Sequence, residues 1–164
     1  MFKKIAITAL LATLMTPAFA ADKTTFYAGV DIGSSKINDV SDKKTSFGGF
    51  AGYQINDNFA LEGAYRNLGS ENYYGVKVDV KQTAISLIAT MPVGNDFSIF
   101  VRVGYNKLTA NVAYQGSKAS DSDSGSLYGV GVSYNWTPTI SSRLEFHRPA
   151  SDLSNIGAAI VFKF

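Results

Sequence analysis

Apolar side chains alternate with small or polar ones over most of the chain, from Phe26 to the final residue, Phe164. No segment after Ala21 keeps the 3.6-residue apolar period of an amphipathic helix. A period of two belongs to a β-strand whose two faces meet different surroundings. The last segment, "GAAIVFKF", follows this pattern although chain ends are usually polar and frayed. The sequence therefore predicts an all-β fold in which the C-terminal segment is a strand of a sheet.

Eight segments carry the alternation, and their connections differ in length. The segments are residues 26–34, 46–55, 61–68, 83–91, 98–105, 127–136, 141–148 and 157–164. Connections at 56–58, at 94–96 and around Pro138 are tight, whereas the intervening ones are longer and polar, the longest being 115–125. Short turns that alternate with long loops are typical of an outer-membrane barrel with both termini in the periplasm.

The fourth segment raises a question of parity. Val76, Val78 and Val80 have even numbers, whereas Ile85 and Leu87 have odd ones, so the apolar face changes near Gln82. A β-bulge would explain this change. So would a position of the valines beyond the membrane, and the sequence leaves both explanations open.

Chain length limits the number of strands. Residues 21–164 number 144, which divided by eight gives 18 for each strand with its connection. A membrane strand needs roughly 9 to 11 residues, so sixteen strands would leave none for turns. A water-soluble sandwich or lipocalin-type barrel would need a charged outer face, but the polar face is mostly Gly, Ser and Ala. We predict a closed eight-stranded antiparallel up-and-down transmembrane β-barrel, which pairs every backbone group within the sheet.

The N-terminal segment has the pattern of a cleaved signal peptide. Lys3 and Lys4 precede an apolar run over residues 5–15, and Ala18 and Ala20 provide the small residues at which a signal peptidase cuts. A helix over that run spans only about 16 Å, too short for a bilayer. We predict a signal peptide at residues 1–20, cleavage between Ala20 and Ala21, and a barrel domain at residues 21–164.

Composition excludes several classes of protein. Removing Lys3 and Lys4 with the signal peptide leaves 13 basic and 13 acidic residues, so charge gives no argument for binding nucleic acid. The chain has no Cys, which excludes a disulfide framework and a thiolate metal site. No cofactor is predicted.

Charged side chains fall on the inner face of the predicted barrel. The interior charge network consists of Asp31, Glu62, Arg66, Arg102, Arg143 and Glu145, with Lys163 near the end of the chain. Eight strands leave an interior just wide enough for side chains to fill, and isolated charges there are costly. We predict a salt-bridged plug that fixes the barrel. The alternative is a narrow passive pathway for small solutes.

Candidate catalytic and metal groups are weak. His147 is the only His, and the nearby "HRPAS" offers only Ser151 as a nucleophile, so we predict a surface or lumen-rim His and no enzyme. Residues 121–125, "DSDSG", look like half a calcium loop but lack its later bidentate Glu. We predict a solvated loop tip there and no metal site.

Aromatic side chains gather toward both ends of the predicted outer face, as they do at the two interfaces of a membrane protein. Toward one end are Tyr53, Phe97, Trp136, Phe162 and Phe164, and toward the other are Tyr65, Tyr105, Tyr128 and Phe146.

The chain resembles the OmpA-like family of eight-stranded outer-membrane barrels, which includes small OmpX-like barrels. The resemblance covers nearly all of residues 21–164 and rests on "GGFAGYQIND" with "LEGAYRNLG", on "VGVSYNWTPTISSRLEF" and on the terminal "AIVFKF". It implies an interior charge cluster at Glu62, Arg102 and Arg143. The chain departs from the family pattern at Ile88, Ser133 and Asp31, where an inward Lys, an inward Glu and a Lys would be expected. The cluster is therefore rewired.

The resemblance also implies a location and partners. The expected location is the outer membrane of a Gram-negative cell, in contact with lipid and lipopolysaccharide. Ile160, Phe162 and Phe164 look like the C-terminal signal that the outer-membrane assembly machinery reads. Since the sequence stops after the eighth strand, we expect no peptidoglycan-binding domain.

Two functions follow as expectations. The first is a structural or surface-interaction role for a monomer, with loops that bind an extracellular ligand and serve adhesion or recognition. The second is a narrow porin-like channel.

Overall fold

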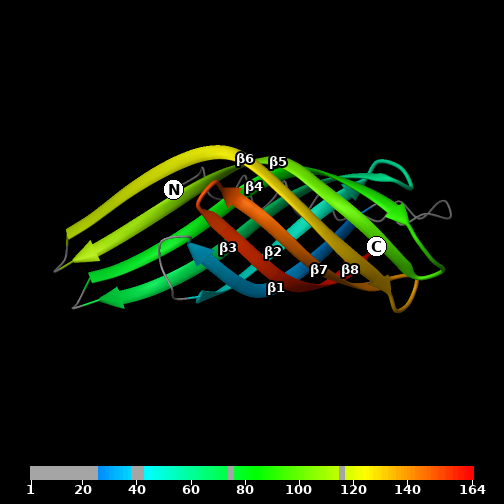
Figure 1. The fold of residues 1–164 in the computed structure, drawn as a ribbon, viewed down its shortest axis with the longest axis horizontal. Helices are drawn as coiled ribbons and strands as arrows, with labels where there is room; N and C mark the ends of the chain where they lie inside the picture. The colour runs from blue at the N-terminus through cyan, green and yellow to red at the C-terminus, as the bar shows by residue number, and fades with distance from the viewer. Residues whose placement is uncertain (1–25, 38–42, 74–75, 115–116) are drawn as a thin grey trace, which may run out of the picture.

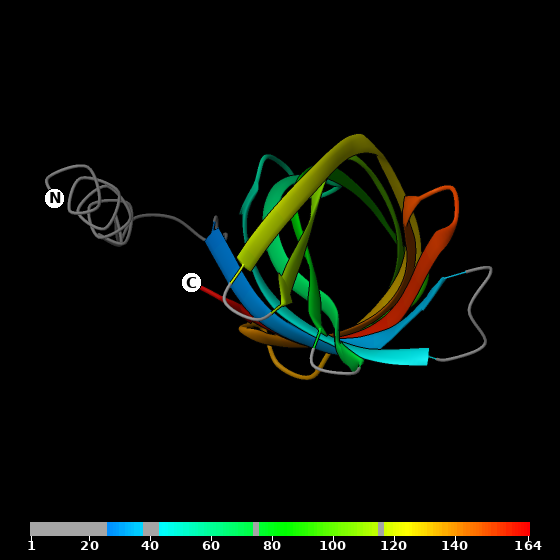
Figure 2. The same cartoon turned by 90° about the vertical axis from the view of Figure 1, so that its left-hand side faces the viewer.

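The computed structural model describes residues 26–37, 43–73, 76–114 and 117–164. They form eight strands, which are β1 (Phe26–Ile37), β2 (Lys43–Gln54), β3 (Phe59–Tyr73), β4 (Val76–Pro92), β5 (Phe97–Tyr114), β6 (Ser117–Asn135), β7 (Ile140–Ala150) and β8 (Leu153–Lys163). Each strand pairs with the next, and β8 pairs with β1, so the sheet closes into an antiparallel barrel (Figures 1 and 2). The predicted fold is confirmed. Within these ranges no helix is long and apolar enough to cross a membrane.

The two ends of the barrel differ. The short-turn end holds the turns at 55–58, 93–96 and 136–139 together with Phe26 and Phe164. At the opposite end, which we call the long-strand end, β4, β5 and β6 extend beyond the other strands (Figure 1). These three strands have 17, 18 and 19 residues, whereas β1, β2, β7 and β8 have 11 or 12. The predicted loop at 115–125 is therefore wrong for most of its length. Residues 117–125 belong to β6, and "DSDSG" is strand rather than loop tip.

The change of parity near Gln82 is not a bulge in β4. The pairing of β4 with β5 runs without a shift from Val76 to Pro92. The bulge lies in β3, where the register shifts between Asn67 and Gly69, and Leu68 is the extra residue. Gly69 has a φ of 155°, which L-residues with a side chain rarely adopt. Because β4 itself has no bulge, Val80 points to the same inner side as Gln82.

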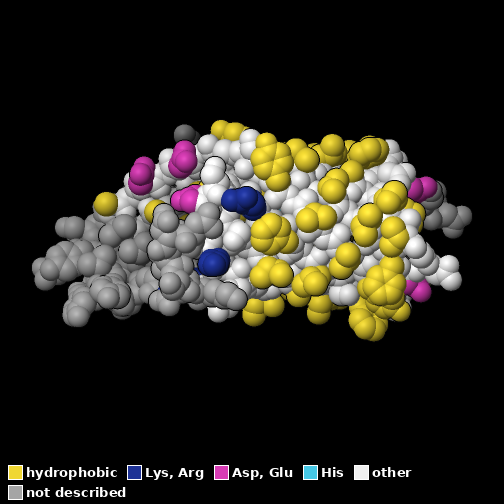
Figure 3. All heavy atoms as spheres, viewed as in Figure 1, with side chains coloured by type: hydrophobic (Ala, Val, Ile, Leu, Met, Phe, Trp, Pro, Cys, Tyr) yellow, Lys and Arg dark blue, Asp and Glu magenta, His cyan; other side chains and the backbone are white. Residues whose placement is uncertain are grey.

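The outer surface is apolar around the barrel. In Figure 3 hydrophobic side chains cover the right-hand part of the face, Lys and Arg side chains lie at the left-hand border of this area, and acidic side chains lie toward both ends. All nine predicted outward aromatics are exposed, from 43% for Tyr53 to 68% for Phe164. In the closing strand Ala158, Ile160 and Phe162 alternate outward with buried or half-buried Ala159 and Val161. This is the exposure pattern of a surface that faces lipid.

Candidate functional site

Glu62 is the centre of the barrel interior. Its carboxylate is fully buried and is shared between two guanidinium groups. Arg102 Nη2 lies 2.7 Å from Glu62 Oε1, and Arg143 Nη1 lies 2.7 Å from Glu62 Oε2. The Tyr27 hydroxyl donates to the same Oε2 at 3.0 Å. One carboxylate therefore holds strands β1, β5 and β7 to β3.

The structure brings together all six residues of the predicted charge network. Arg102 forms a bidentate pair with Glu145, in which Nη2 donates to Oε2 at 3.0 Å. Arg66 Nε donates to Asp31 Oδ2 at 2.9 Å. The network contains three acids and three bases, so it carries no net charge. All six side chains come from β1, β3, β5 and β7.

Three aromatic rings surround the guanidinium of Arg143. Its Cζ lies 4.9 Å from the ring centre of Tyr27, 5.4 Å from that of Phe50 and 5.5 Å from that of Phe100. A cation over aromatic faces gains about 0.5 to 2 kcal/mol, more where water is excluded. We call these three rings the aromatic cage. The interior is thereby filled across its whole width at this level.

Each ring of the aromatic cage lies against a glycine in a neighbouring strand. Tyr27 pairs with Gly52, Phe50 with Gly29 and Phe100 with Gly131. A Cβ on any of these glycines would overlap the ring opposite. The period of two puts Tyr27, Phe50 and Phe100 on the inner face of their strands, but it does not show that they form a group. The signal that could have found them is an inward aromatic residue whose register partner is Gly.

We expect Gly52→Ala to destabilise the barrel by about 1–3 kcal/mol, because the new methyl group displaces the Tyr27 ring and its hydrogen bond to Glu62. Gly63→Ala is the matched control, since a Cβ there meets nothing within 4 Å and lies on the outer face of the adjoining strand. Urea unfolding in lipid vesicles, followed by the fluorescence of Trp136, measures both. Equal stability of the two variants would show that the cage does not depend on Gly52.

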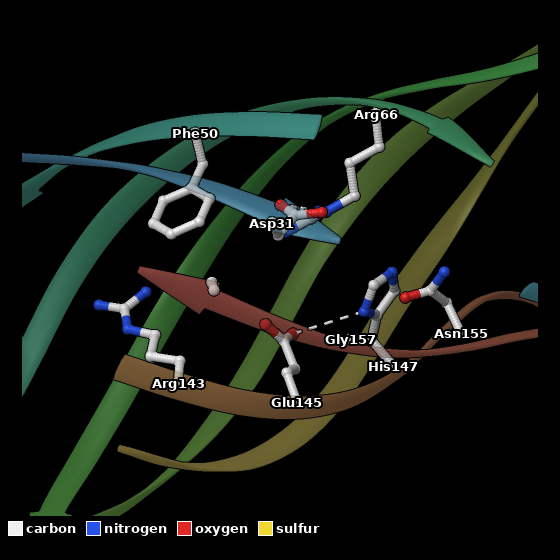
Figure 4. Close-up of a pocket in the computed structure, with 9 residues that line it drawn as sticks. Asp31, Phe50, Arg66, Arg143, Glu145, His147, Asn155 and Gly157 are labelled. Carbon is white, nitrogen blue, oxygen red and sulfur yellow. Dashed lines mark hydrogen bonds and ion pairs between the residues drawn. The ribbon is translucent and has the colours of Figure 1, made fainter. Parts of the chain in front are cut away.

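A polar layer lies beyond the charge network, toward the long-strand end. Asn155 Nδ2 donates to Ser46 Oγ at 2.6 Å and contacts Ser35 Oγ at 2.9 Å. His147 is only 3% exposed, and its Nδ1 lies 3.8 Å from Glu145 Oε1 (Figure 4). The expectation of a surface or lumen-rim His is therefore wrong as to the surface, because the His147 side chain is buried inside the barrel. A cavity of about 10 Å³ between Asp31, Glu145 and His147 has room for about one water molecule.

Apolar side chains close the interior above this layer. The buried side chains are those of Leu68, Leu127, Pro149 and Leu153. Leu68 and Pro149 lie nearer the long-strand end than the charged residues of β3 and β7, Leu127 pairs with Gly104 beyond Arg102, and Leu153 pairs with Ile37 beyond Asp31. Asn106 Nδ2 donates to the carbonyl of Pro149 at 2.8 Å, which fixes the end of β7 over the lumen. Ile88, where the family pattern has an inward Lys, is 1% exposed and belongs to the apolar cluster with the aromatic cage. Buried apolar side chains thus lie on both sides of the polar layer.

The last residues are held in the sheet. The backbone N–H of Phe164 donates to the carbonyl of Phe26 at 2.8 Å, and Lys163 Nζ donates to Asn135 Oδ1 at 2.9 Å. Ile160, Phe162 and Phe164 point outward with exposures of 51%, 45% and 68%. Ala20 and Ala21, the predicted cleavage site, lie outside the described residues, as does the rest of the predicted signal peptide.

The described residues contain no group of three His, Cys, Asp or Glu side chains that could hold a metal ion. His147 has no hydrogen-bond partner for either ring nitrogen in the part of the chain that the structure describes. What the interior side chains provide is a set of ion pairs that neutralise one another and a packed core.

A closed barrel with an apolar outside and a filled, charge-paired inside is an integral membrane β-barrel. The model of the family described as outer membrane protein beta-barrel domain matches residues 6–162. The chain belongs to this family and is an outer membrane protein.

The relatives agree with this assignment. The chain is 31% identical over 161 residues to outer membrane protein A of Shigella flexneri, with 87% of this chain and 46% of that protein covered. It spans about half the length of the first curated relatives that it matches.

Solved barrels have the same fold. Neisserial surface protein A is 20% identical, with a TM-score of 0.68 over 85% of this chain and 97% of that one. Ail of Yersinia pestis, solved in complex with the heparin analogue sucrose octasulfate, is 14% identical, with a TM-score of 0.60 over 85% and 97%.

Proposed function

We propose that this protein is a closed barrel that stabilises the outer membrane and presents its long-strand end to the exterior for adhesion or recognition. The packed interior carries this proposal, because the charge network, the aromatic cage and the apolar layer above them leave space for about one water molecule near the charges. A hydrated solute needs a continuous water-filled path. No enzymatic activity is proposed, since the single His has no hydroxyl partner among the described residues.

Recording in planar bilayers tests the proposal against the alternative of a narrow channel. The closed barrel gives no discrete conductance steps. Steps that change in Glu62→Ala or Arg143→Ala would establish the channel instead, because these residues hold the packed interior together. Migration on a gel with and without heating verifies that each variant is folded.

The orientation belongs to the same proposal. Both ends of the barrel chain, Phe26 and Phe164, lie at the short-turn end, which we place in the periplasm together with Asp57 and Asp96 of its turns. The likeness to Ail supports a ligand-binding role for the other end, although the shared feature is the fold alone.

Lipopolysaccharide is the partner that we propose for the rim of the long-strand end. Outward positions just beyond the aromatic residues of this end carry cations from four strands, namely Lys36, Lys81, Lys107 and Arg148. Anionic head groups attract such cations by about 1 kcal/mol each. We expect Lys81→Gln with Lys107→Gln to weaken lipopolysaccharide binding roughly 30-fold in a micelle titration. Lys163→Gln, at the other end, is the control and should leave the affinity unchanged.

The exposed Ile160, Phe162 and Phe164 are proposed as the signal that the assembly machinery reads. Deleting Phe164 should reduce the amount of protein inserted into the outer membrane in cells, while the variant refolded in detergent keeps its closed barrel. The measurement is outer-membrane fractionation with heat-dependent gel migration. Normal insertion of the truncated chain would contradict the signal.

A further inference from the structure

The outer part of β6 has a free edge. β6 pairs with β5 along its whole length, but with β7 only from Tyr128 to Asn135. Among the described strands, residues 117–127, which we call the β6 edge, therefore have a neighbour on the β5 side only. β6 is eight residues longer than β7, which corresponds to about 25 Å of strand at the long-strand end (Figure 1).

The fold itself creates this edge. β7 pairs with β6 as far as Arg148 and turns into β8 through the Ala150–Leu153 pair. Pro149 has no N–H to donate, and the register of β7 against β8 shifts between His147 and Ala150. β7 therefore cannot accompany β6 further outward.

Two aspartate side chains accept hydrogen bonds from backbone N–H groups of the β6 edge. Alternate residues of an antiparallel strand direct their N–H and C=O groups to opposite sides. The N–H of Ser122 donates to Asp121 Oδ1 at 2.9 Å, and the N–H of Ser124 donates to Asp123 Oδ1 at 2.9 Å. These two N–H groups are thus satisfied by carboxylates instead of by a neighbouring strand, while the edge keeps its carbonyl acceptors.

The charge of the two aspartates selects among strands that could add here. Both side chains are exposed, and their register partners on β5 are Ala110 and Leu108, which offer no positive charge. A second copy of the β6 edge, paired antiparallel, would bring four carboxylates together, and like charges opposite each other destabilise a strand pair. The Lys or Arg side chains of a basic strand would instead be attracted to the two carboxylates.

We propose that the β6 edge binds an extended basic segment of a partner protein by strand addition, an inference that rests on the proposed exposure of the long-strand end. A Lys or Arg of the incoming strand draws each carboxylate into an ion pair, which releases the N–H of Ser122 or Ser124 to a carbonyl of that strand. A neutral or acidic strand has no cation that could replace the backbone N–H as the partner of the carboxylate. Asp121 and Asp123 thereby determine the specificity of the surface.

The test uses the full chain in lipid nanodiscs and two synthetic peptides of equal length, one alternating Lys with Thr and the other Glu with Thr. We expect the Lys peptide to slow amide hydrogen exchange at Ser122 and Ser124. We expect Asp121→Asn with Asp123→Asn to weaken its binding about tenfold, and 0.5 M salt to weaken it as well. Asp96→Asn removes one charge at the short-turn end and serves as the control.

Three results of the peptide experiment would overturn the inference. They are equal binding of the two peptides, equal affinity for the wild type and the double variant, and protection of amides elsewhere than in the β6 edge. Dimerisation of the double variant without peptide binding by the wild type also contradicts it, since the aspartates then only prevent self-association. Conductance of the same purified protein in planar bilayers reports separately on the closed barrel, so a failure of the proposed function is distinguishable.

Discussion

Glu62→Gln is expected to lower the free energy of unfolding by about 3–5 kcal/mol, because it removes one member of a buried ion-pair network and leaves its partners uncompensated. Glu62 is fully buried and pairs with both Arg102 and Arg143, so the amide cannot neutralise either guanidinium. Urea unfolding in lipid vesicles gives the free energy, and the temperature at which the folded gel band disappears gives an independent value.

Asp96→Asn is the matched control for Glu62→Gln. It removes the same charge at an exposed turn position, where substitutions usually change stability by less than about 0.5 kcal/mol. A loss in Glu62→Gln as small as that in Asp96→Asn would mean that the charge network does not stabilise the barrel. The packed-interior argument for the proposed function would then lose its main support.

Ile160→Arg is expected to destabilise the membrane-inserted barrel by about 2–4 kcal/mol, the cost of an Arg at the middle of the lipid face. Ile160 is 51% exposed, pairs with Val30 of β1 and is the middle one of the five exposed apolar positions from Ile156 to Phe164. The measurement is urea unfolding in vesicles of fixed lipid composition.

Ile55→Arg tests the depth dependence of this effect. Ile55 is equally exposed, at 54%, but belongs to the turn that leads into Phe59 at the short-turn end. A cost of about 1 kcal/mol or less is expected there. Similar costs at both positions would contradict a lipid band centred on Ile160.

The alternation of apolar residues, with chain length and the composition of the polar face, was sufficient to predict the eight-stranded barrel, because a period of two assigns faces without any knowledge of partners. It left open only which side of the fourth strand faces inward between Val76 and Val80. It could not predict how far the strands continue. Residues 117–125 contain Ser, Asp, Lys and Gly, which sequence rules assign to loops, yet pairing with β5 keeps them in a strand. Tertiary pairing outweighed local propensity.

The charge network shows the same limit. Parity placed Glu62, Arg102 and Arg143 inside, but their partners depend on the stagger of strands around the barrel, which the sequence does not state. The link between Glu62 and Arg143 joins residues 81 positions apart. Likewise, the aromatic cage depends on which glycine stands opposite each ring, so it required the register.

The six charged side chains of the network lie on β1, β3, β5 and β7, so they find their ion-pair partners only when several strands have assembled. Among these six described residues no ion pair joins two adjacent strands, because Asp31 reaches from β1 to Arg66 in β3, and Glu62 in β3 reaches across to Arg143 in β7. An isolated hairpin or an incomplete sheet therefore carries charges without their native partners, which lipid disfavours. Intermediates of insertion are thus penalised until β7, which contributes Arg143 and Glu145, has joined the sheet.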